Sequence, residues 1–263
     1  SQGYLKTTGI MHLDEILKGL AEKRRPNNTP MFGHDLYWIG IFGDPAKENE
    51  AWGWQLDGHH LALNITVVGD EVSVRPAFMG SDPARLPEGT YSGWQVQGAE
   101  DEKGKKLFES LDEKQRAKAI IAEVAPRDVI TGPTRGDQLK TPVGLPASDL
   151  NPAQRRLFMS LLSEYAHNYE HNIAHIQMDR ILNSGLEKIH FSWAGTDENK
   201  PYYYRIHGPS VIIEFDNHYP PGRNSGPINH IHTVFREPGN DYGEDLLKKH
   251  LLESPHHQKE IQK

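Results

Sequence analysis

The chain has 263 residues, of which 36% are hydrophobic and 25% charged, a composition typical of a folded globular protein. Its formal net charge of -7 argues against nucleic acid as a partner, because phosphate contacts need a basic surface. It contains no cysteine, which excludes disulfides, thiolate nucleophiles and cysteine-held metal ions. No apolar run approaches the ~20 residues that a transmembrane helix needs. Any bound metal would therefore take its ligands from His, Asp, Glu or amide oxygens.

The first predicted element is an amphipathic helix over residues 10–23, in which Ile and Leu side chains recur at helical spacing. Residues 24–30 then indicate a loop. A short strand over residues 36–42 ends at a Gly-Asp-Pro turn, and a second strand begins at Ala51. These two strands are expected to form an antiparallel pair with a long connection.

The apolar side chains change phase within the next stretch. Those of residues 52–56 share one strand face, whereas those of residues 59–67 have the opposite parity. One extra residue at Gly58, a β-bulge, would bring both sets to one core face. That bulge would place His59 among the core residues and turn His60 to the polar face. Bulges recur beside active sites because they re-aim side chains.

Turn and cap signals divide the middle of the chain. Gly69 and Asp70 predict a hairpin turn into a strand over residues 72–76, while residues 78–99 are rich in loop-forming residues. A capping-box pattern at Ser110 predicts a helix that ends near residue 125. Residues 131–146 are punctuated by Pro and Gly and indicate an ordered surface loop or a linker.

The second half predicts one long helix followed by strands. Asn151 caps the helix, with Pro152 at its first position, and the helix ends near Gly185. Four strands follow at residues 189–193, 202–206, 211–215 and 228–235, with a His-Gly-Pro turn between the middle two. The expected fold is a single α+β domain over residues 1–263, with a mostly antiparallel sheet and two or three packed helices. Residues 255–263 are expected to fray.

Two histidine segments carry the strongest chemical signal. His230 and His232 project from the same face of a strand, because alternate residues do so. Neutral imidazole is the commonest metal ligand in proteins and also a frequent general base. His60, on the polar side of its own segment, would complete a set of three. A structural explanation also stays open, in which the paired histidines only form hydrogen bonds across the sheet.

Glu214 is a carboxylate within an otherwise apolar strand, and burying it costs heavily unless it is paired. Arg236 is one candidate partner. Together with the three imidazoles, Glu214 would form a nitrogen–oxygen site that suits a divalent transition metal such as zinc, copper, iron or manganese. Without metal, the same groups would act as acid, base and oxyanion-stabilising residues.

A second histidine set lies on the predicted long helix. His167, His171 and His175 recur at spacing four and therefore line one helical face. The His-Glu-x-x-His order of metalloproteases is absent, and the apolar residues occupy other positions of the helix. The spacing therefore favours a solvated or interface stripe over a ligand set.

At these segments the chain resembles the bacterial and fungal family called domain of unknown function 3500. The resemblance rests on residues 52–61, 190–195, 202–217 and 230–236, and it extends from about residue 37 to residue 250. It implies no activity. It implies an exported protein, a further helical segment before residue 1, and a shared polar site made of His59, His60, Glu214, His230, His232 and Arg236.

The leading hypothesis is a metal-assisted enzyme that acts on a small polar or carbohydrate-like substrate. In it, the histidines at positions 60, 230 and 232 bind the metal, and Glu214 is a fourth ligand or the general base. Arg236 holds an anionic group or a developing charge, and residues 217–227 form a lid. Two alternatives remain: a metal-free hydrolase or lyase, and a non-catalytic protein that binds a ligand or glycan through its aromatic side chains. No signal in the chain points to an oligomeric state.

Overall fold

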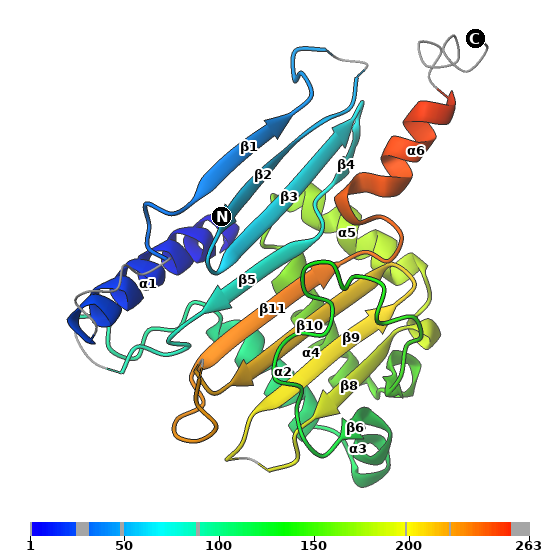
Figure 1. Ribbon diagram of the computed structural model, residues 1–263. Helices are drawn as coiled ribbons and strands as arrows, with labels where there is room; N and C mark the ends of the chain where they lie inside the picture. Colours follow the sequence, from blue (N-terminus) through cyan, green and yellow to red (C-terminus); the bar gives the residue numbers. More distant parts are fainter. Residues whose placement is uncertain are drawn as a thin grey trace.

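The fold was analysed in a computed structural model that describes residues 2–24, 32–47, 50–87, 90–197, 199–220 and 222–253. It is an α+β fold in which helices pack on one large sheet (Figure 1). The strands are β1 (Trp38–Phe42), β2 (Trp52–Gly58), β3 (Leu61–Val68), β4 (Glu71–Ser73), β5 (Ala77–Ser81), β6 (Ile120–Ala122), β7 (Leu145–Pro146), β8 (His190–Ala194), β9 (Tyr202–Gly208), β10 (Val211–His218) and β11 (His230–Arg236).

The described residues also form helices. They are α1 (Gln2–Arg24), α2 (Gly98–Glu109), α3 (Glu113–Ala119), α4 (Pro152–Ala166), α5 (His171–Asn183) and α6 (Glu244–Glu253), with short 3-10 turns η1 (Ala147–Asp149), η2 (Leu186–Lys188) and η3 (Asp241–Gly243). No helix in the described ranges combines the length and the apolar character that a membrane span needs.

The sheet joins two groups of strands that are distant in sequence. Its order is β1-β2-β3-β5-β11-β10-β9-β8-β6, with β4 paired to β3 and β7 paired to β8. The β6–β8 pair is parallel, and the other pairs between described strands are antiparallel. β5 pairs with β3 on one side and with β11 on the other. This junction brings the turn after β2 close to the start of β11.

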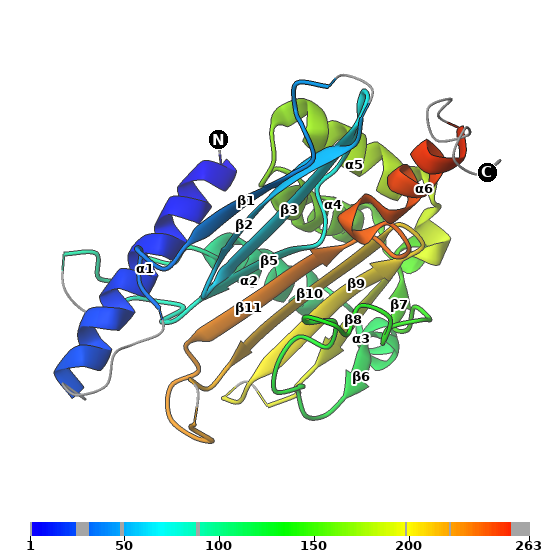
Figure 2. The same ribbon diagram turned by 45° about the horizontal axis from the view of Figure 1, so that its top comes forward.

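The two faces of the sheet are covered differently. Helices α2, α4 and α5 lie behind the sheet, α1 lies beside the β1–β5 half, and the segment of residues 123–144 crosses the front (Figures 1 and 2). The helical face holds the main core, where the Tyr165 hydroxyl of α4 lies 2.6 Å from that of Tyr204. Phe215 and Phe235 belong to the same core. Even-numbered residues of β10 and β11 therefore face the front.

Local signals placed several elements correctly. The antiparallel β1–β2 and β3–β4 pairs, the hairpin between β9 and β10 and the mostly antiparallel sheet are confirmed. Asn151 caps α4 as predicted, since its side chain accepts from the backbone N–H of Ala153 and Gln154 at 2.9 Å each. The expected tail at residues 255–263 and most of the loop at residues 24–30 lie outside the described residues.

The expected β-bulge at Gly58 is wrong, because the chain reverses there. Gly58 lies opposite Leu61 in the β2–β3 pair, so that only His59 and His60 form the turn. Cross-strand partners share a face, which puts the apolar residues of both strands on one side without an extra residue. His59 is exposed, so its assignment to the core is wrong, whereas His60 is 1% exposed.

The prediction of two or three helices is too low, since six α-helices occur in the described part of the chain. The predicted long helix is interrupted: α4 ends at Ala166, and α5 restarts at His171 with Glu170 as its N-cap. The capping box lies at Asp112 and Gln115, two residues after the predicted position. Strand β5 formed at the start of the stretch where loops were expected, and helix α2 formed over residues that were mostly left unassigned, because tertiary contacts override weak local signals.

Candidate metal centre

Three imidazoles from two distant segments meet where β3, β5 and β11 join. His60 comes from the β2–β3 turn, and His230 and His232 come from β11. One potential ligand atom of each lies within 4.8 Å of the others. The Nε2 atoms of His60 and His230 are 3.1 Å apart, and the ring centroids of His230 and His232 are 4.5 Å apart. The structure therefore brings together the three histidines singled out in the sequence, and we call them the imidazole group.

Gly80 of β5 makes room for this group. It lies opposite His232 in the β5–β11 pair, and its N–H donates to the carbonyl oxygen of His60 at 2.7 Å. A Cβ atom at Gly80 would lie 2.6 Å from Cδ2 of His60 and 3.0 Å from Cδ2 of His232. The two rings thus occupy the space that a side chain at this position would need.

Carboxylates hold two of the rings through Nδ1. Asp14 of α1 accepts at 2.8 Å from Nδ1 of His60, and its second oxygen accepts from the Tyr37 hydroxyl at 2.5 Å. Asp128 accepts at 2.9 Å from Nδ1 of His232. An imidazole that donates Nδ1–H to a carboxylate has its lone pair on Nε2, where it can bind a metal ion or accept a hydrogen bond, as Nε2 of His60 can from Nε2 of His230 at 3.1 Å. This is the arrangement that orients histidine ligands in metal sites.

His230 has a looser third carboxylate. Its Nδ1 lies 4.0 Å from Asp82 and has no hydrogen-bond partner, although the atom is buried. Burial, together with the neighbouring imidazoles, holds the pKa of His230 far below its ordinary value. Burial also raises the pKa of Asp82. His230 is therefore neutral, which is the form that binds metal ions.

Glu214 lies outside this imidazole group. Its Oε2 accepts from Ile130 N and from the Tyr203 hydroxyl at 2.7 Å each, and its Oε1 accepts from Thr131 N at 2.8 Å and from the Thr131 hydroxyl. The side chain is 0% exposed. Four donors therefore satisfy this carboxylate, and they fasten the front segment to β10.

Arg236 secures the same segment and does not pair with Glu214. Its Nε donates to Asp241 at 2.7 Å, and its Nη1 donates to the carbonyl oxygen of Thr131. Glu214 and Arg236 thus hold the stretch that follows Asp128, and Asp128 in turn contacts His232. Both residues act on the imidazole group through the position of this segment.

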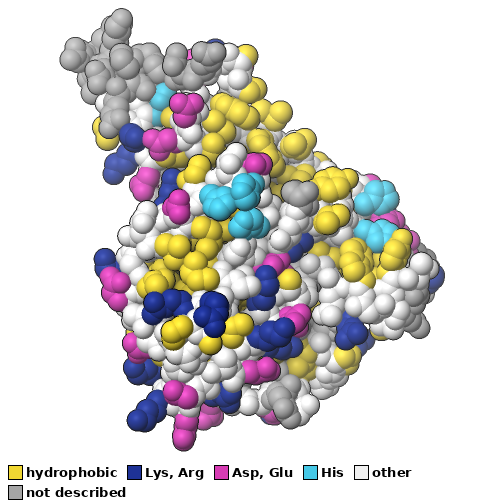
Figure 3. Space-filling model, turned by 180° about the vertical axis from the view of Figure 1, so that it is seen from behind, with side chains coloured by type: hydrophobic (Ala, Val, Ile, Leu, Met, Phe, Trp, Pro, Cys, Tyr) yellow, Lys and Arg dark blue, Asp and Glu magenta, His cyan; other side chains and the backbone are white. Residues whose placement is uncertain are grey.

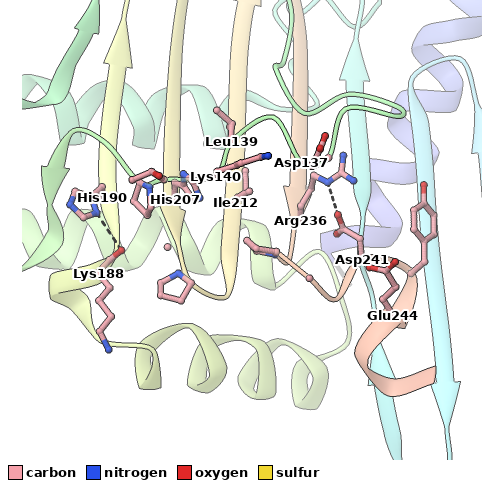
Figure 4. A pocket seen from close by; sticks show the side chains of 18 of the residues that line it. Asp137, Leu139, Lys140, Lys188, His190, His207, Ile212, Arg236, Asp241 and Glu244 are labelled. Carbon is pink, nitrogen blue, oxygen red and sulfur yellow. Dashed lines mark hydrogen bonds and ion pairs between the residues drawn. The ribbon is translucent and has the colours of Figure 1, made fainter. Parts of the chain in front are cut away.

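Two cavities open between the front segment and the sheet. The smaller, of about 320 Å³, is lined by residues that include His59, Phe78, Asp128, His232 and Arg236, and so borders the imidazole group. The larger, of about 1110 Å³, lies farther along the sheet, with His190 and His207 at one end and Arg236 and Asp241 at the other (Figure 4). Of these two cavities, only the smaller is lined by one of the three clustered histidines, His232.

Sequence reasoning missed four acidic residues and His218. Asp216 and His218 extend β10 beyond Phe215, where the predicted strand ended, and they face the same side as Glu214. Continuing the strand alternation by three residues would have found both. Asp14, Asp82 and Asp128 have no such signal, because they reach the group only through tertiary contacts.

The second histidine set, on the helical side of the sheet, also clusters in space, although the long helix that was expected to carry it is interrupted. Potential ligand atoms of His167, His171 and His175 lie within 4.8 Å of one another. The Nε2 atoms of His171 and His175 are 3.1 Å apart. Figure 3 shows a group of histidine side chains exposed on this surface. The set is separate from the imidazole group at the sheet junction.

Residues 1–244 match the family described as "Protein of unknown function (DUF3500)". The chain belongs to the DUF3500 family. The resemblance predicted from the sequence blocks is thereby confirmed. No curated protein and no solved structure matches the chain. Membership in DUF3500 therefore transfers no activity, and functional conclusions depend on the site itself.

Replacing Glu214 with Gln is expected to destabilise the fold by roughly 2–3 kcal/mol, because an amide nitrogen would face donors that now bind a carboxylate oxygen. Urea unfolding measures the loss. Trypsin should also cut residues 123–144 faster in this variant, since the anchor of the segment is weakened. Exposed Glu187→Gln is the control. A change below about 0.5 kcal/mol in Glu214→Gln would contradict the anchoring role.

The stability of the protein should fall between pH 7 and pH 5 partly because of His207. Burial, and secondarily Arg205, lowers the pKa of His207 from 6.5 to about 4. The unfolded chain therefore binds a proton in this window that the folded protein does not, and stability decreases as the pH drops. His207→Gln should flatten this dependence in urea unfolding, whereas exposed His175→Gln should not. Equal slopes for wild type and His207→Gln would rule out this contribution.

Gly80→Ala is expected to displace His60 and to destabilise the protein by about 1–3 kcal/mol, because the new methyl group would overlap the ring. Thermal unfolding measures the effect. Gly19→Ala is the matched control, since a Cβ at this helical position meets no atom within 4 Å. Gly80→Ala with an unchanged melting temperature would show that the space beside His60 is not restricted.

Proposed function

We propose that the protein is a metal-dependent hydrolase in which His60, His230 and His232 bind one divalent transition-metal ion. The support is the convergence of three imidazoles whose Nδ1 atoms face carboxylates, in a buried place beside a cavity. Three protein ligands are the usual number in catalytic zinc sites, where the fourth position is left for water or substrate. The 3.1 Å between two Nε2 atoms is close to the ~3.3 Å implied by tetrahedral metal–nitrogen bonds of about 2.0–2.1 Å.

Charge gives a second argument for a cation. Asp14 is 0% exposed, and its partners are the His60 imidazole and the Tyr37 hydroxyl. Among the described residues, the ion pairs of Asp14 and Asp82 involve histidine alone, with no Lys or Arg. Buried carboxylates need compensating charge, and a bound divalent ion would supply it.

The chemistry follows from the ion and its surroundings. A divalent ion in this position would activate water and polarise a carbonyl or phosphoryl oxygen. The cavity of about 320 Å³ limits the substrate to a small polar molecule or to one part of a larger one. Arg236 lines the same cavity; since its Nε and Nη1 already donate to Asp241 and Thr131, an anionic group of the substrate would bind at its Nη2. In this proposal Glu214 is neither a metal ligand nor the general base, because its two oxygens already accept four hydrogen bonds.

Metal analysis of untagged protein, purified without chelator, tests the proposal. His60→Ala, His230→Ala and His232→Ala should each lose one equivalent of metal, whereas His12→Ala should lose none, since His12 is exposed and lies outside the group. Hydrolysis of a panel of esters, phosphate esters and glycosides should stop on chelation and return when metal is restored. Turnover that survives chelation and the loss of bound metal would instead favour a metal-free acid–base enzyme.

Asp14→Asn and Asp128→Asn should weaken metal binding by about 10–100-fold, because each removes the acceptor that orients a ligand imidazole. Competition with a chromophoric chelator measures the affinity. Asp70→Asn, a change of an exposed carboxylate outside every potential ligand set of the described residues, provides the comparison. Unaltered affinity in both Asp14→Asn and Asp128→Asn would refute the orienting role of the carboxylates.

A further inference from the structure

A second set of potential ligands adjoins the imidazole group. Ligand atoms of Asp216, His218 and His232 lie within 4.8 Å of one another, and His232 is common to both sets. In the β10–β11 pair, Asp216 lies opposite His232 and His218 lies opposite His230. Residues directly opposite in an antiparallel pair share a face. The ring centroids of His218 and His230 are 4.5 Å apart. The two sets therefore form one continuous polar patch.

Asp216 is the decisive member of this second set. Its side chain is 0% exposed, and its Oδ2 has no hydrogen-bond partner. Its Oδ1 accepts from Nδ1 of His218 at 2.5 Å, which is the one ion pair recorded for Asp216 among the described residues. A buried carboxylate oxygen without a donor points to a ligand that the protein itself does not provide.

The total charge around the patch also exceeds what one ion would balance. Four carboxylates contact the imidazoles of this patch. They are Asp14, Asp82, Asp128 and Asp216. Among the described residues, the one Lys or Arg that pairs with any of these carboxylates is Arg135, which lies 4.0 Å from Asp128. With Arg135 counted, the set carries a charge of about -3, so that one divalent ion would leave a negative charge uncompensated and a second ion would remove it.

We infer that a second divalent cation binds at Asp216 and His218, next to the ion held by His60, His230 and His232. The inference rests on the proposed function, because it extends the same centre. Paired ions in hydrolytic enzymes lie about 3.5–4 Å apart and stabilise both the attacking and the leaving oxygen of a displacement. Asp216 supplies the oxygen ligand of the second ion, and its free Oδ2 is the atom that the ion would engage.

Stoichiometry separates a two-ion centre from a one-ion centre. Each protein carries His171→Ala and His175→Ala, which removes the exposed histidine set on the helical side as a competing site. Metal-free protein is equilibrated with Zn²⁺ and dialysed, and bound zinc is measured. We expect two ions in the otherwise wild-type chain and one in Asp216→Asn or in His218→Gln. His12→Ala, a change of an exposed histidine outside every potential ligand set of the described residues, should retain two ions.

Electron paramagnetic resonance of the Mn²⁺-loaded protein gives a readout that does not depend on activity. Two adjacent ions should produce an exchange-coupled spectrum, and Asp216→Asn should convert it into that of a single ion. Asp216→Asn keeps the shape of the side chain, and circular dichroism verifies its fold.

If the otherwise wild-type chain binds only one ion, and this ion is lost in His60→Ala but kept in Asp216→Asn, the second cation is overturned and the proposed function stays intact. One ion that is lost in His218→Gln would also overturn the second cation, since His218 would then belong to the first site. Wild-type protein without bound metal would refute both.

Discussion

The carboxylate of Glu214 is the interaction on which the front of the molecule depends. It is fully buried on β10 and receives four hydrogen bonds, three of them from the segment that crosses the sheet. A buried charge without these donors would cost several kcal/mol, so the segment and the strand stabilise each other. Arg236 adds a contact to Thr131 from the next strand. Their joint effect is to place Asp128 on His232 and to form the cavity beside the imidazoles.

The imidazole group depends equally on the sheet order. β5 pairs with β3 and β11, so a short strand rich in small residues brings a turn near residue 60 next to a strand that begins at residue 230. Gly80 gives the rings their space, and α1 adds Asp14 from outside the sheet. The chemistry therefore combines groups from a helix, a turn, a strand and a loop. Each is held by contacts that are distant in sequence, which is a common way to obtain a rigid polar site in a buried position.

Strand alternation was sufficient to pair His230 with His232, because a period of two is a local property of the backbone. It failed at Gly58, where a phase change has two explanations, a bulge or a reversal, and only the pairing of β2 with β3 distinguishes them. The sequence marked Glu214 as a carboxylate that needs a partner, but it could not show that backbone donors of a distant loop would satisfy it. Helix α2 was missed because its sequence is mostly charged, and its burial against α4 is a tertiary effect. Asp14, Asp82 and Asp128 were beyond local reasoning for the same reason, because they reach the imidazoles only through tertiary contacts.

The contact between His60 and His230 joins positions 170 residues apart, and Asp14 extends the connection into the first helix. An ion held there would act as a cross-link that closes a very long loop, and its binding energy would count directly toward folding. Such a cross-link ties α1 and the β1–β3 strands to the C-terminal half of the sheet. Ion removal would then lower the stability of this N-terminal portion first, and its amide hydrogens would exchange with solvent before those of β8–β10.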